Sequence, residues 1–312
     1  MNNKPLDIVG LGSCSIDHIT KVRTFADKDN KVTSDNIESM GGGVTANNLV
    51  QTARLGLKTG WCGAWGDDAL ATQLAELFAQ EGITYSAHTF EKTQFAWIII
   101  DAQGEKEIYI FPNSTLLLTP SIVEKEFRKQ IEQGKHFHTE VGVIPLAAAI
   151  AGARIAKSVG SKVFLDIDGD VGYLLHEAKL GTKQELQQLI QLSDVVKLSE
   201  SAAMQLAEEK GLNKVIQELL QSAEIVAVTF GKKGCIIADR TEIVNCPAYA
   251  VSVLDGTGAG DAFMGGLSYA LLQGWDLRKT GMFANACGAH CCTQLGARGS
   301  GTLDEINTLM VR

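Results

Sequence analysis

Hydrophobic and polar residues follow two different periods along the chain, and these periods predict its secondary structure. Short apolar runs are typical of buried strands, and segments whose apolar residues recur every three to four positions are typical of amphipathic helices. The two patterns alternate regularly from about residue 120 onward. Such alternation predicts an α/β fold with a mostly parallel sheet covered on both faces. The expected strands lie near 6–12, 57–65, 136–139, 162–166, 194–198 and 224–230, and the expected helices include 69–80, 147–159, 183–191 and 213–221.

One part of the N-terminal half does not fit this alternation. The aromatic β-rich runs 94–100 and 106–111 flank a Gly-containing turn, which predicts a hairpin with no helix between its strands. We therefore expect the segments of about 15–40 and 92–113 to form a small separate sheet, a lid able to exclude water from a site. No repeat or low-complexity linker separates two cores, so 1–312 is expected to be a single domain carrying this lid.

Composition and charge exclude several classes of protein. The 312 residues are 45% hydrophobic and carry a net charge of −8, which disfavours a nucleic-acid partner. No apolar run has the length of a membrane span, and the N-terminus leads directly into a strand pattern. The seven cysteines are odd in number and form no C-x-x-C pair, so reduced, buried thiols are expected. These features together predict a cytoplasmic protein.

The stretch Asp255-Gly-Thr-Gly-Ala-Gly-Asp261 leads directly into a helical pattern that ends near Leu272. Glycines at the start of a helix let several backbone N–H groups converge on an anion, and the helix dipole adds to the attraction. Asp261 falls in the first turn, where its carboxylate is expected to stay ionised. Amide donors beside an ionised carboxylate suit phosphoryl transfer to a hydroxyl.

Other phosphate-binding patterns are incomplete. Gly10-Leu-Gly-Ser-Cys-Ser15 lacks the third glycine of a dinucleotide fingerprint and is followed by a strand pattern, and the chain contains no P-loop motif. His136 and His138 share one strand face, but no third ligand stands at a metal-binding spacing, so a structural role is expected.

Polar residues suited to a sugar occur further upstream. Asp17 follows the first strand at the end where ligands of parallel sheets gather, although a solvated turn explains an aspartate there equally well. The run Gly41-Gly-Gly-Val-Thr-Ala-Asn-Asn48 precedes a helix, and Asn47 and Asn48 offer donors and acceptors for hydroxyls. Taken alone, this run is also explained as a turn with a helix cap.

Together these motifs resemble the ribokinase (PfkB-type) family of carbohydrate and nucleoside kinases, in order over most of the chain. The residues that carry the resemblance are Gly258-Ala-Gly-Asp261, Gly42-Gly-Val-Thr-Ala-Asn47 and Gly66-Asp-Asp68. The resemblance implies a ribokinase-like αβα sandwich with a β-sheet lid, ATP as phosphate donor, and a homodimer formed through the lid.

The resemblance also implies roles for individual residues. Asp261 is the general base, and the amides of Gly258, Ala259 and Gly260 form an anion hole. The implied sugar-binding residues are Asp17, Gly42, Gly43, Asn47, Glu140 and Asp261. The implied nucleotide-binding residues are Ser199, Thr229, Gly231, Gly234, Gly258, Gly260 and Asn285. A monovalent cation such as K⁺ would be held by Asp255, Thr257, Cys291, Gln294, Gly296 and Ser300.

The chain departs from the family pattern at four positions. Gly256 stands where a threonine is common, and Val44 stands where ribokinase has a lysine, so ribose is not assured as the substrate. In the N-x-x-E motif, which orders magnesium-bound water, Ser199 replaces the asparagine and Ala202 the glutamate. Mg²⁺ is still expected with ATP, because it neutralises the phosphates.

The leading hypothesis is an ATP-dependent sugar kinase that phosphorylates a hydroxyl of a small fructose- or ribose-like sugar. A nucleoside kinase of the same family is the first alternative, and a catalytically impaired sugar- or nucleotide-binding regulator is the second. Specificity is expected to depend on lid and pocket side chains, with Phe95, Trp97, Phe111 and Asn113 as candidates.

Overall fold

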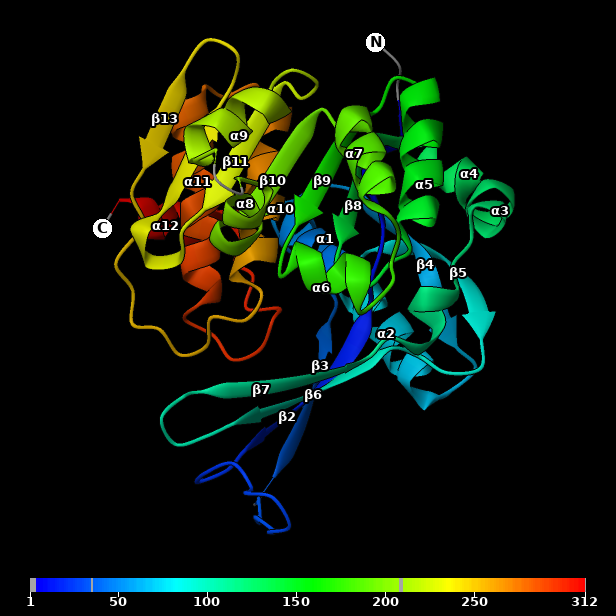
Figure 1. The fold of residues 1–312 in the computed structure, drawn as a ribbon, viewed down its shortest axis with the longest axis vertical. Coiled ribbons are helices and arrows are strands. Elements are labelled where there is room, and N and C mark those ends of the chain that lie inside the picture. Colours follow the sequence, from blue (N-terminus) through cyan, green and yellow to red (C-terminus); the bar gives the residue numbers. More distant parts are fainter. Residues whose placement is uncertain (1–3, 35, 208–209, 312) are drawn as a thin grey trace.

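The described residues of this computed structural model, 4–34, 36–207 and 210–311, form a nine-stranded sheet and a separate four-stranded sheet (Figure 1). The strands are β1 (Leu6–Leu11), β2 (Ser15–Lys21), β3 (Ile37–Gly42), β4 (Thr59–Gly66), β5 (Thr84–Phe90), β6 (Phe95–Ile100), β7 (Lys106–Phe111), β8 (Gly134–Val141), β9 (Lys162–Ile167), β10 (Val195–Ser199), β11 (Ile225–Thr229), β12 (Cys235–Ala238) and β13 (Ile243–Cys246). The helices are α1 (Val44–Arg54), α2 (Ala69–Gln80), α3 (Pro120–Ile122), α4 (Arg128–Ile131), α5 (Leu146–Ser158), α6 (Val171–His176), α7 (Lys183–Leu192), α8 (Glu200–Ala207), α9 (Leu212–Leu219), α10 (Ala259–Leu272), α11 (Leu277–Cys291) and α12 (Leu303–Met310).

The order of strands in the large sheet determines where a ligand can bind. The order is β13-β12-β11-β10-β9-β8-β1-β4-β5, and the strands from β11 to β5 pair in parallel. The chain leaves β1 toward β4 on one side and later adds β8 on the other side. Ligands of open parallel sheets bind where the strand order reverses, beyond the carboxyl ends of the strands. That crevice lies here between the ends of β1 and β8.

Helices cover both faces of the large sheet, as the alternating pattern predicts. On one face α1, α10 and α11 pack together, and on the other α5 packs with α7 while α8 packs with α9 (Figure 1). Neighbouring residues of β1 point to opposite faces: Ile8 packs in the cluster around α1, and Val9 packs in the cluster around α5. Burial on both faces explains the continuous apolar runs of these strands.

The small sheet has the order β3-β2-β6-β7 and lies below the main body in Figure 1. Its strands lie in the segments expected to form a lid, except that β3 runs on to Gly42, past the expected end at about residue 40. The Gly66-Asp-Asp68 turn ties it to the main body: Asp68 caps α2 through Ala71 N and accepts hydrogen bonds from Thr93 N and Thr93 Oγ1, at 2.8 and 2.6 Å. We call this four-stranded sheet the lid.

Several boundaries differ from the predicted ones. Helix α1 begins at Val44, so Asn47 and Asn48 lie inside the helix and not in the loop before it. Strand β5 and helix α12 were not predicted. In β5 only partly buried and exposed positions alternate, which weakens its apolar signal, whereas α12 carries a Thr302–Glu305 capping box that could have indicated it. None of the helices among the described residues is long and apolar enough to cross a membrane.

Candidate active site

Helix α10 begins without a side-chain cap, and this places unpaired amides next to a cavity. Gly258 is the N-cap residue with φ of 78°, and a Cβ there would collide with Ala297 O, so a glycine is required. The first amides of a helix have no partner within the helix. Ala259 N makes only a long 3.4 Å bond to Gly256 O, and both Ala259 and Gly260 line the cavity. An anion is the natural partner of such a helix start.

The cavity beside α10 has a volume of about 520 Å³ and collects most of the residues predicted to bind nucleotide. Thr229, Gly231, Gly234 and Asn285 all line it, together with Gly260. The remaining lining residues are Lys232, Ala248, Tyr249, Ala250, Val251, Val253, Gly256, Ala259, Phe263, Gly288, Ala289 and Cys292. A mostly apolar cavity that ends at a helix N-terminus has the chemistry to hold a base at one end and phosphates at the other.

Two of the residues predicted to bind nucleotide make hydrogen bonds within the protein. Asn285 Nδ2 donates to Cys246 O and Pro247 O, both at 3.0 Å, and so holds the wall of the cavity in place. Ser199 does not line the cavity; its hydroxyl accepts a hydrogen bond from Ala202 N at 3.2 Å in the first turn of α8. Glu200, two residues before Ala202 in the chain, is half-exposed and pairs with Lys233 at 3.4 Å.

A buried lysine lies directly behind the anion-binding amides. Lys197 in β10 is fully buried and forms an ion pair with Asp166 at 2.9 Å. Its Nζ is 3.0 Å from the position that a Cβ would take on Gly260, and Asp168 Oδ2 is 3.8 Å from the same point. Burial opposes the charged form, but Asp166 and Asp168 outweigh it and raise the pKa of Lys197, while Lys197 lowers the pKa of Asp168. Lys197 therefore stays an ammonium.

Asp261, the predicted base, lies in the first turn of α10 and is 6% exposed. Burial raises its pKa well above the usual range for a carboxyl group, and the Asp166 charge adds to this effect. A hydrogen bond from Asn47 Nδ2 to Asp261 Oδ2 at 2.8 Å acts in the opposite direction, as does Lys197. The expectation of an ionised carboxylate rested on the helix dipole alone and left out desolvation, which is the largest cause of the raised pKa.

The residues predicted to bind a sugar are brought together by Arg298. Its Nε donates to Asn47 Oδ1 at 3.2 Å and its Nη2 donates to Gly42 O at 3.1 Å. Asp17, on β2, lies so close to Gly42 that a Cβ on Gly42 would collide with its carboxylate. Burial raises the pKa of Asp17, and Arg298 lowers it. Asp17, Gly42 and Asn47 therefore form one polar surface that continues to Asp261.

Glu140 and Gly43 complete this surface at the carboxyl end of β8. Glu140 Oε2 accepts hydrogen bonds from Thr45 N at 2.8 Å and Thr45 Oγ1 at 2.6 Å, so it caps the start of α1 from another element. Glu140 Oε1 is buried and has no partner among the residues described. Gly43 is the N-cap residue of α1 with φ of 93°. Both residues lie at the crevice between β1 and β8.

The predicted cation-binding residues form two facing turns that are largely bonded to each other. Asp255 Oδ1 accepts from Thr257 N at 2.9 Å and from Thr257 Oγ1 at 2.7 Å, and Asp255 Oδ2 accepts from Gly296 N at 3.0 Å. Cys291 Sγ donates to Thr257 O at 3.5 Å, and Gln294 N donates to Cys291 O at 3.1 Å. Ser300 Oγ is buried without a partner in the described part of the chain.

The two histidines have a structural role. His136 Nδ1 and His138 Nε2 each lie 2.9 Å from Ser268 Oγ, in the middle of α10. Burial lowers the pKa of His136 to about 3 and that of His138 well below its usual value, so both stay neutral. These contacts fix α10 against β8.

Sequence reasoning missed Lys197, Asp166, Asp168 and Arg298. A lysine inside an apolar strand run was the available signal for Lys197, because an unpaired lysine is almost never fully buried. Asp166 and Asp168 follow a strand at the sheet end where ligands gather. Arg298 had no local signal, since its partners are more than 250 residues away in the sequence.

The lid aromatics that were expected to determine specificity lie on the face of the lid opposite Asp17. In the strand register Ala96 pairs with Asp17, so Phe95 and Trp97 point to the opposite face of the lid. Phe95 stacks on Phe111 there, with ring centroids 4.4 Å apart. Asn113 Nδ2 donates to Thr93 O at 2.8 Å, a contact between the residues just before β6 and just after β7. The face of the lid that carries Asp17 has aliphatic residues beside it, such as Ile19 and Ile98.

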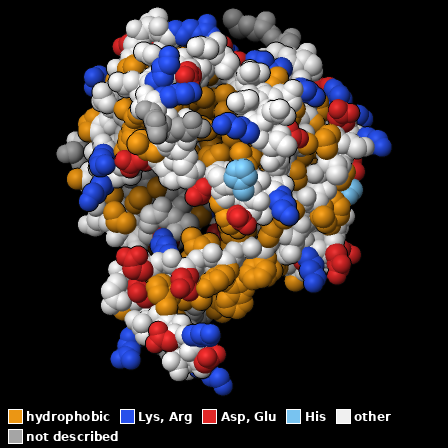
Figure 2. Space-filling model, viewed as in Figure 1, with side chains coloured by type: hydrophobic (Ala, Val, Ile, Leu, Met, Phe, Trp, Pro, Cys, Tyr) orange, Lys and Arg blue, Asp and Glu red, His pale blue; other side chains and the backbone are white. Residues whose placement is uncertain are grey.

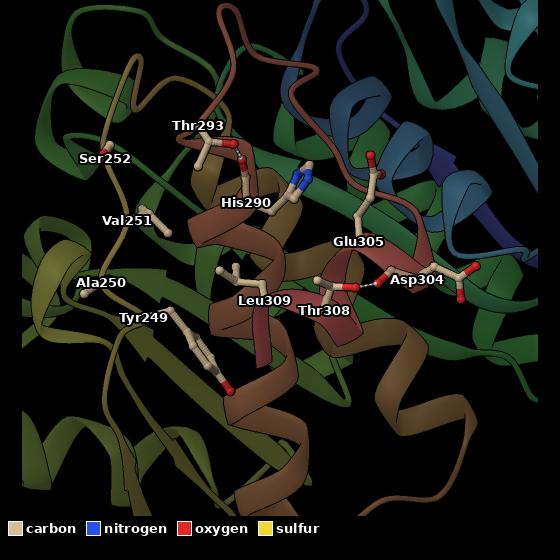
Figure 3. A pocket seen from close by; sticks show the side chains of 10 residues that line it. All are labelled: Tyr249, Ala250, Val251, Ser252, His290, Thr293, Asp304, Glu305, Thr308 and Leu309. Atoms are coloured by element: carbon tan, nitrogen blue, oxygen red, sulfur yellow. Dashed lines mark hydrogen bonds between the residues drawn. The ribbon is translucent and has the colours of Figure 1, made fainter. Parts of the chain in front are cut away.

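A larger cavity of about 940 Å³ lies outside the site between the 249–252 segment and α12 (Figure 3). Two of its polar side chains make local hydrogen bonds: Thr293 Oγ1 donates to His290 O and Thr308 Oγ1 donates to Asp304 O, as Figure 3 shows. It shares only the segment 249–251 with the cavity beside α10. Most of the residues predicted to bind nucleotide line the smaller cavity beside α10 and not this one.

Substitution of Lys197 by methionine tests the buried charge pair. We expect Lys197→Met to lower the free energy of unfolding by about 3–5 kcal/mol, because Asp166 would remain buried without its cation. The double variant Lys197→Met/Asp166→Asn removes both charges and should recover most of this loss. Urea unfolding followed by circular dichroism measures both. A single variant as stable as the double variant would contradict the pairing.

Comparisons with known proteins identify the family of this chain. Residues 6–303 match the family described as pfkB family carbohydrate kinase. A probable fructokinase-5 from Arabidopsis thaliana is 28% identical over 317 residues, which cover 95% of this chain and 94% of that protein. A ribokinase from Haemophilus influenzae is 28% identical over 299 residues, 93% of each chain.

Solved structures share the fold over almost the whole chain. A fructokinase from Xylella fastidiosa with bound ATP has a TM-score of 0.80 at 25% identity and covers 98% of each chain. A ribokinase from Thermotoga maritima has a TM-score of 0.83 at 24% identity and covers 98% of this chain and 100% of that one. The predicted ribokinase-like fold is therefore confirmed, and the chain belongs to the pfkB family of carbohydrate kinases.

Proposed function

We propose that the chain is one kinase domain that transfers the γ-phosphate of ATP to a hydroxyl of a small fructose- or ribose-like sugar. The observation that carries this proposal is the buried Asp261 carboxylate at the uncapped start of α10, between a nucleotide-sized cavity and the polar surface of Asp17, Gly42 and Asn47. Relatives named fructokinase and ribokinase support a sugar as acceptor.

In the proposed reaction Asp261 accepts the proton of the sugar hydroxyl while the hydroxyl oxygen bonds to the γ-phosphorus. The bond between that phosphorus and the β,γ-bridging oxygen breaks, and ADP leaves with the electron pair. The amides of Gly258, Ala259 and Gly260 donate to the transferred phosphoryl group, and the Lys197 ammonium behind Gly260 adds positive charge. Asn47 orients the Asp261 carboxylate toward the hydroxyl.

Mg²⁺ fits this site as a partner of ATP rather than as a metal held by the protein alone. No group of three or more His, Cys, Asp or Glu side chains among the described residues is arranged to hold a metal ion. Mg²⁺ commonly binds through phosphates, water and one or two carboxylates. Asp168, held ionised by Lys197 close to Gly260, is the carboxylate that would support it. When bound, Mg²⁺ neutralises charge on the phosphates.

The lid is proposed to form a homodimer contact. Ile37, Trp97, Tyr109 and Phe111 are 41–52% exposed, and Figure 2 shows hydrophobic side chains gathered over β6 and β7. Exposed apolar patches on a soluble protein commonly mark an interface. A monomer in sedimentation equilibrium at micromolar concentration would contradict this contact. Seven free cysteines, six of them buried, support a reducing compartment such as the cytoplasm.

The base is tested by Asp261→Asn, which keeps the size of the side chain but accepts no proton. We expect kcat to fall about 10²–10⁴-fold, the usual contribution of a general base, with an unchanged circular dichroism spectrum. The assay measures ADP release with fructose, ribose and adenosine. Near-normal turnover by the variant would contradict the mechanism.

The same panel separates the alternatives in the wild-type protein. Preference for adenosine over both sugars would favour the nucleoside kinase. Binding of ATP without turnover of any acceptor would favour the regulator. The intact Asp261 and anion-binding amides favour catalysis.

The pH dependence follows from the environment of Asp261. Only the ionised carboxylate accepts a proton, so kcat/KM is retained above the pKa of Asp261 and lost as pH falls through it. Because burial raises this pKa, we expect the acid limb well above the usual range of carboxyl groups. Asn47→Ala removes a hydrogen bond that lowers the pKa, so the limb should move to higher pH. A limb that stays in place or moves down in this variant would contradict the assignment.

A further inference from the structure

A lysine of the lid reaches the loop that precedes α10. Lys106 is the first residue of β7, next to the turn of the β6–β7 hairpin, and its Nζ donates to Asp255 Oδ1 at 2.5 Å and to Thr257 Oγ1 at 2.7 Å. The Asp255 side chain is only 2% exposed, whereas that of Lys106 is 26% exposed. An almost fully buried carboxylate thus receives its counter-charge from another part of the fold.

The position of Lys106 is set by the lid sheet. In the register Lys106 pairs with Ile100, and Ile108 pairs with Ile98, which in turn lies opposite Ile19 of β2. Because side chains alternate along a strand, Lys106, Ile19 and Asp17 project from the same face of the lid. The face that brings Asp17 over the proposed sugar site therefore also brings an ammonium group to Asp255.

The residues expected to bind a monovalent cation fit such an ion poorly. Both oxygens of the Asp255 carboxylate already accept hydrogen bonds. Oδ1 accepts three, one from Lys106 and two from Thr257, and Oδ2 accepts one from Gly296 N. The carbonyl oxygens of Thr257 and Cys291 accept hydrogen bonds as well. Ser300 Oγ is left as a buried hydroxyl with no partner in the described part of the chain, and one hydroxyl does not make a cation site. A K⁺ ion beside Asp255 would also be repelled by the ammonium group.

We propose that the Lys106 ammonium takes the place of the monovalent cation at Asp255, so that this chain needs no added K⁺ and orders its anion-binding loop through the lid. The proposal rests on the proposed kinase function. Asp255 holds Thr257 by two hydrogen bonds, and Thr257 directly precedes Gly258. Neutralising Asp255 with a tethered cation stabilises this turn when the lid is in place. The lid then acts on the anion-binding amides as well as on the sugar.

The test compares wild-type protein with Lys106→Met in KCl and in tetramethylammonium chloride at equal ionic strength. We expect wild-type kcat to agree within about twofold in the two salts, since no cation site is left to fill. In tetramethylammonium, Lys106→Met should lose at least about tenfold in kcat, because the Asp255 charge stays buried and uncompensated. KCl should restore part of this loss in the variant alone. Lys106→Arg, which keeps the positive charge, should retain more activity than Lys106→Met.

A matched control comes from the same row of the lid. Lys21 lies opposite Ile100 on β2, as Lys106 does on β7, but it is exposed and strand β6 separates it from Lys106. Lys21→Met should therefore leave both kcat and its salt dependence unchanged. A loss in this variant equal to that of Lys106→Met would show a general effect of lid charge and overturn the proposal.

Thermal unfolding in the two salts gives a readout that does not need turnover. A cation that binds only the native state stabilises that state, so KCl should raise the melting temperature of Lys106→Met and not that of the wild type. A wild type that requires K⁺ for activity, or a Lys106→Met variant whose losses KCl does not reverse, would overturn the proposal. If the wild type phosphorylates no acceptor in either salt, the proposed function fails, and the melting temperatures still decide the role of Lys106.

Discussion

The first amide groups of a helix have no hydrogen-bond partner within the helix, and at the start of α10 they border a cavity. Gly258 offers no side chain to cap them, and Ala259 and Gly260 open on the cavity. Gly258, Ala259 and Gly260 are only partly buried, so these donors stay accessible to an anion that enters the cavity. The Lys197 ammonium behind Gly260 adds positive charge next to them. Asp261 and the proposed sugar-binding surface lie beside this helix start.

Burial of the Asp261 side chain determines its pKa. The aspartate shares a low-dielectric region with Asp166, Asp168 and a single ammonium, Lys197, so carboxylates outnumber cations there. Burial and the neighbouring negative charge raise its pKa, and the Asn47 hydrogen bond limits the rise. A carboxylate with a raised pKa accepts a proton more readily than an ordinary one. The burial that packs Asp261 into the fold therefore also suits it to the proposed role of a base.

The lid is tied to the main body at three separate places. Thr93, just before β6, donates a hydrogen bond to Asp68. Arg298 donates to Gly42 at the end of β3, and Lys106 at the start of β7 donates to Asp255. The last two contacts each involve a residue next to a proposed ligand site. A shift of the lid would therefore alter the proposed sugar-binding surface and the loop before α10 together. This coupling follows from the geometry of a sheet whose one face carries both Asp17 and Lys106.

The sequence alone determined the α/β alternation, the bounds of α2, the lid hairpin and the position of Asp261 at a helix start, because each depends on residues close together in the chain. Strand β5 was missed because its burial pattern is weak, and Asn47 was placed before α1 although it lies within it. Only the tertiary structure decided the raised pKa of Asp261 and the partners of Lys197, Arg298 and Lys106. Those features depend on burial and on contacts between residues 31 to 256 positions apart, which no local pattern encodes.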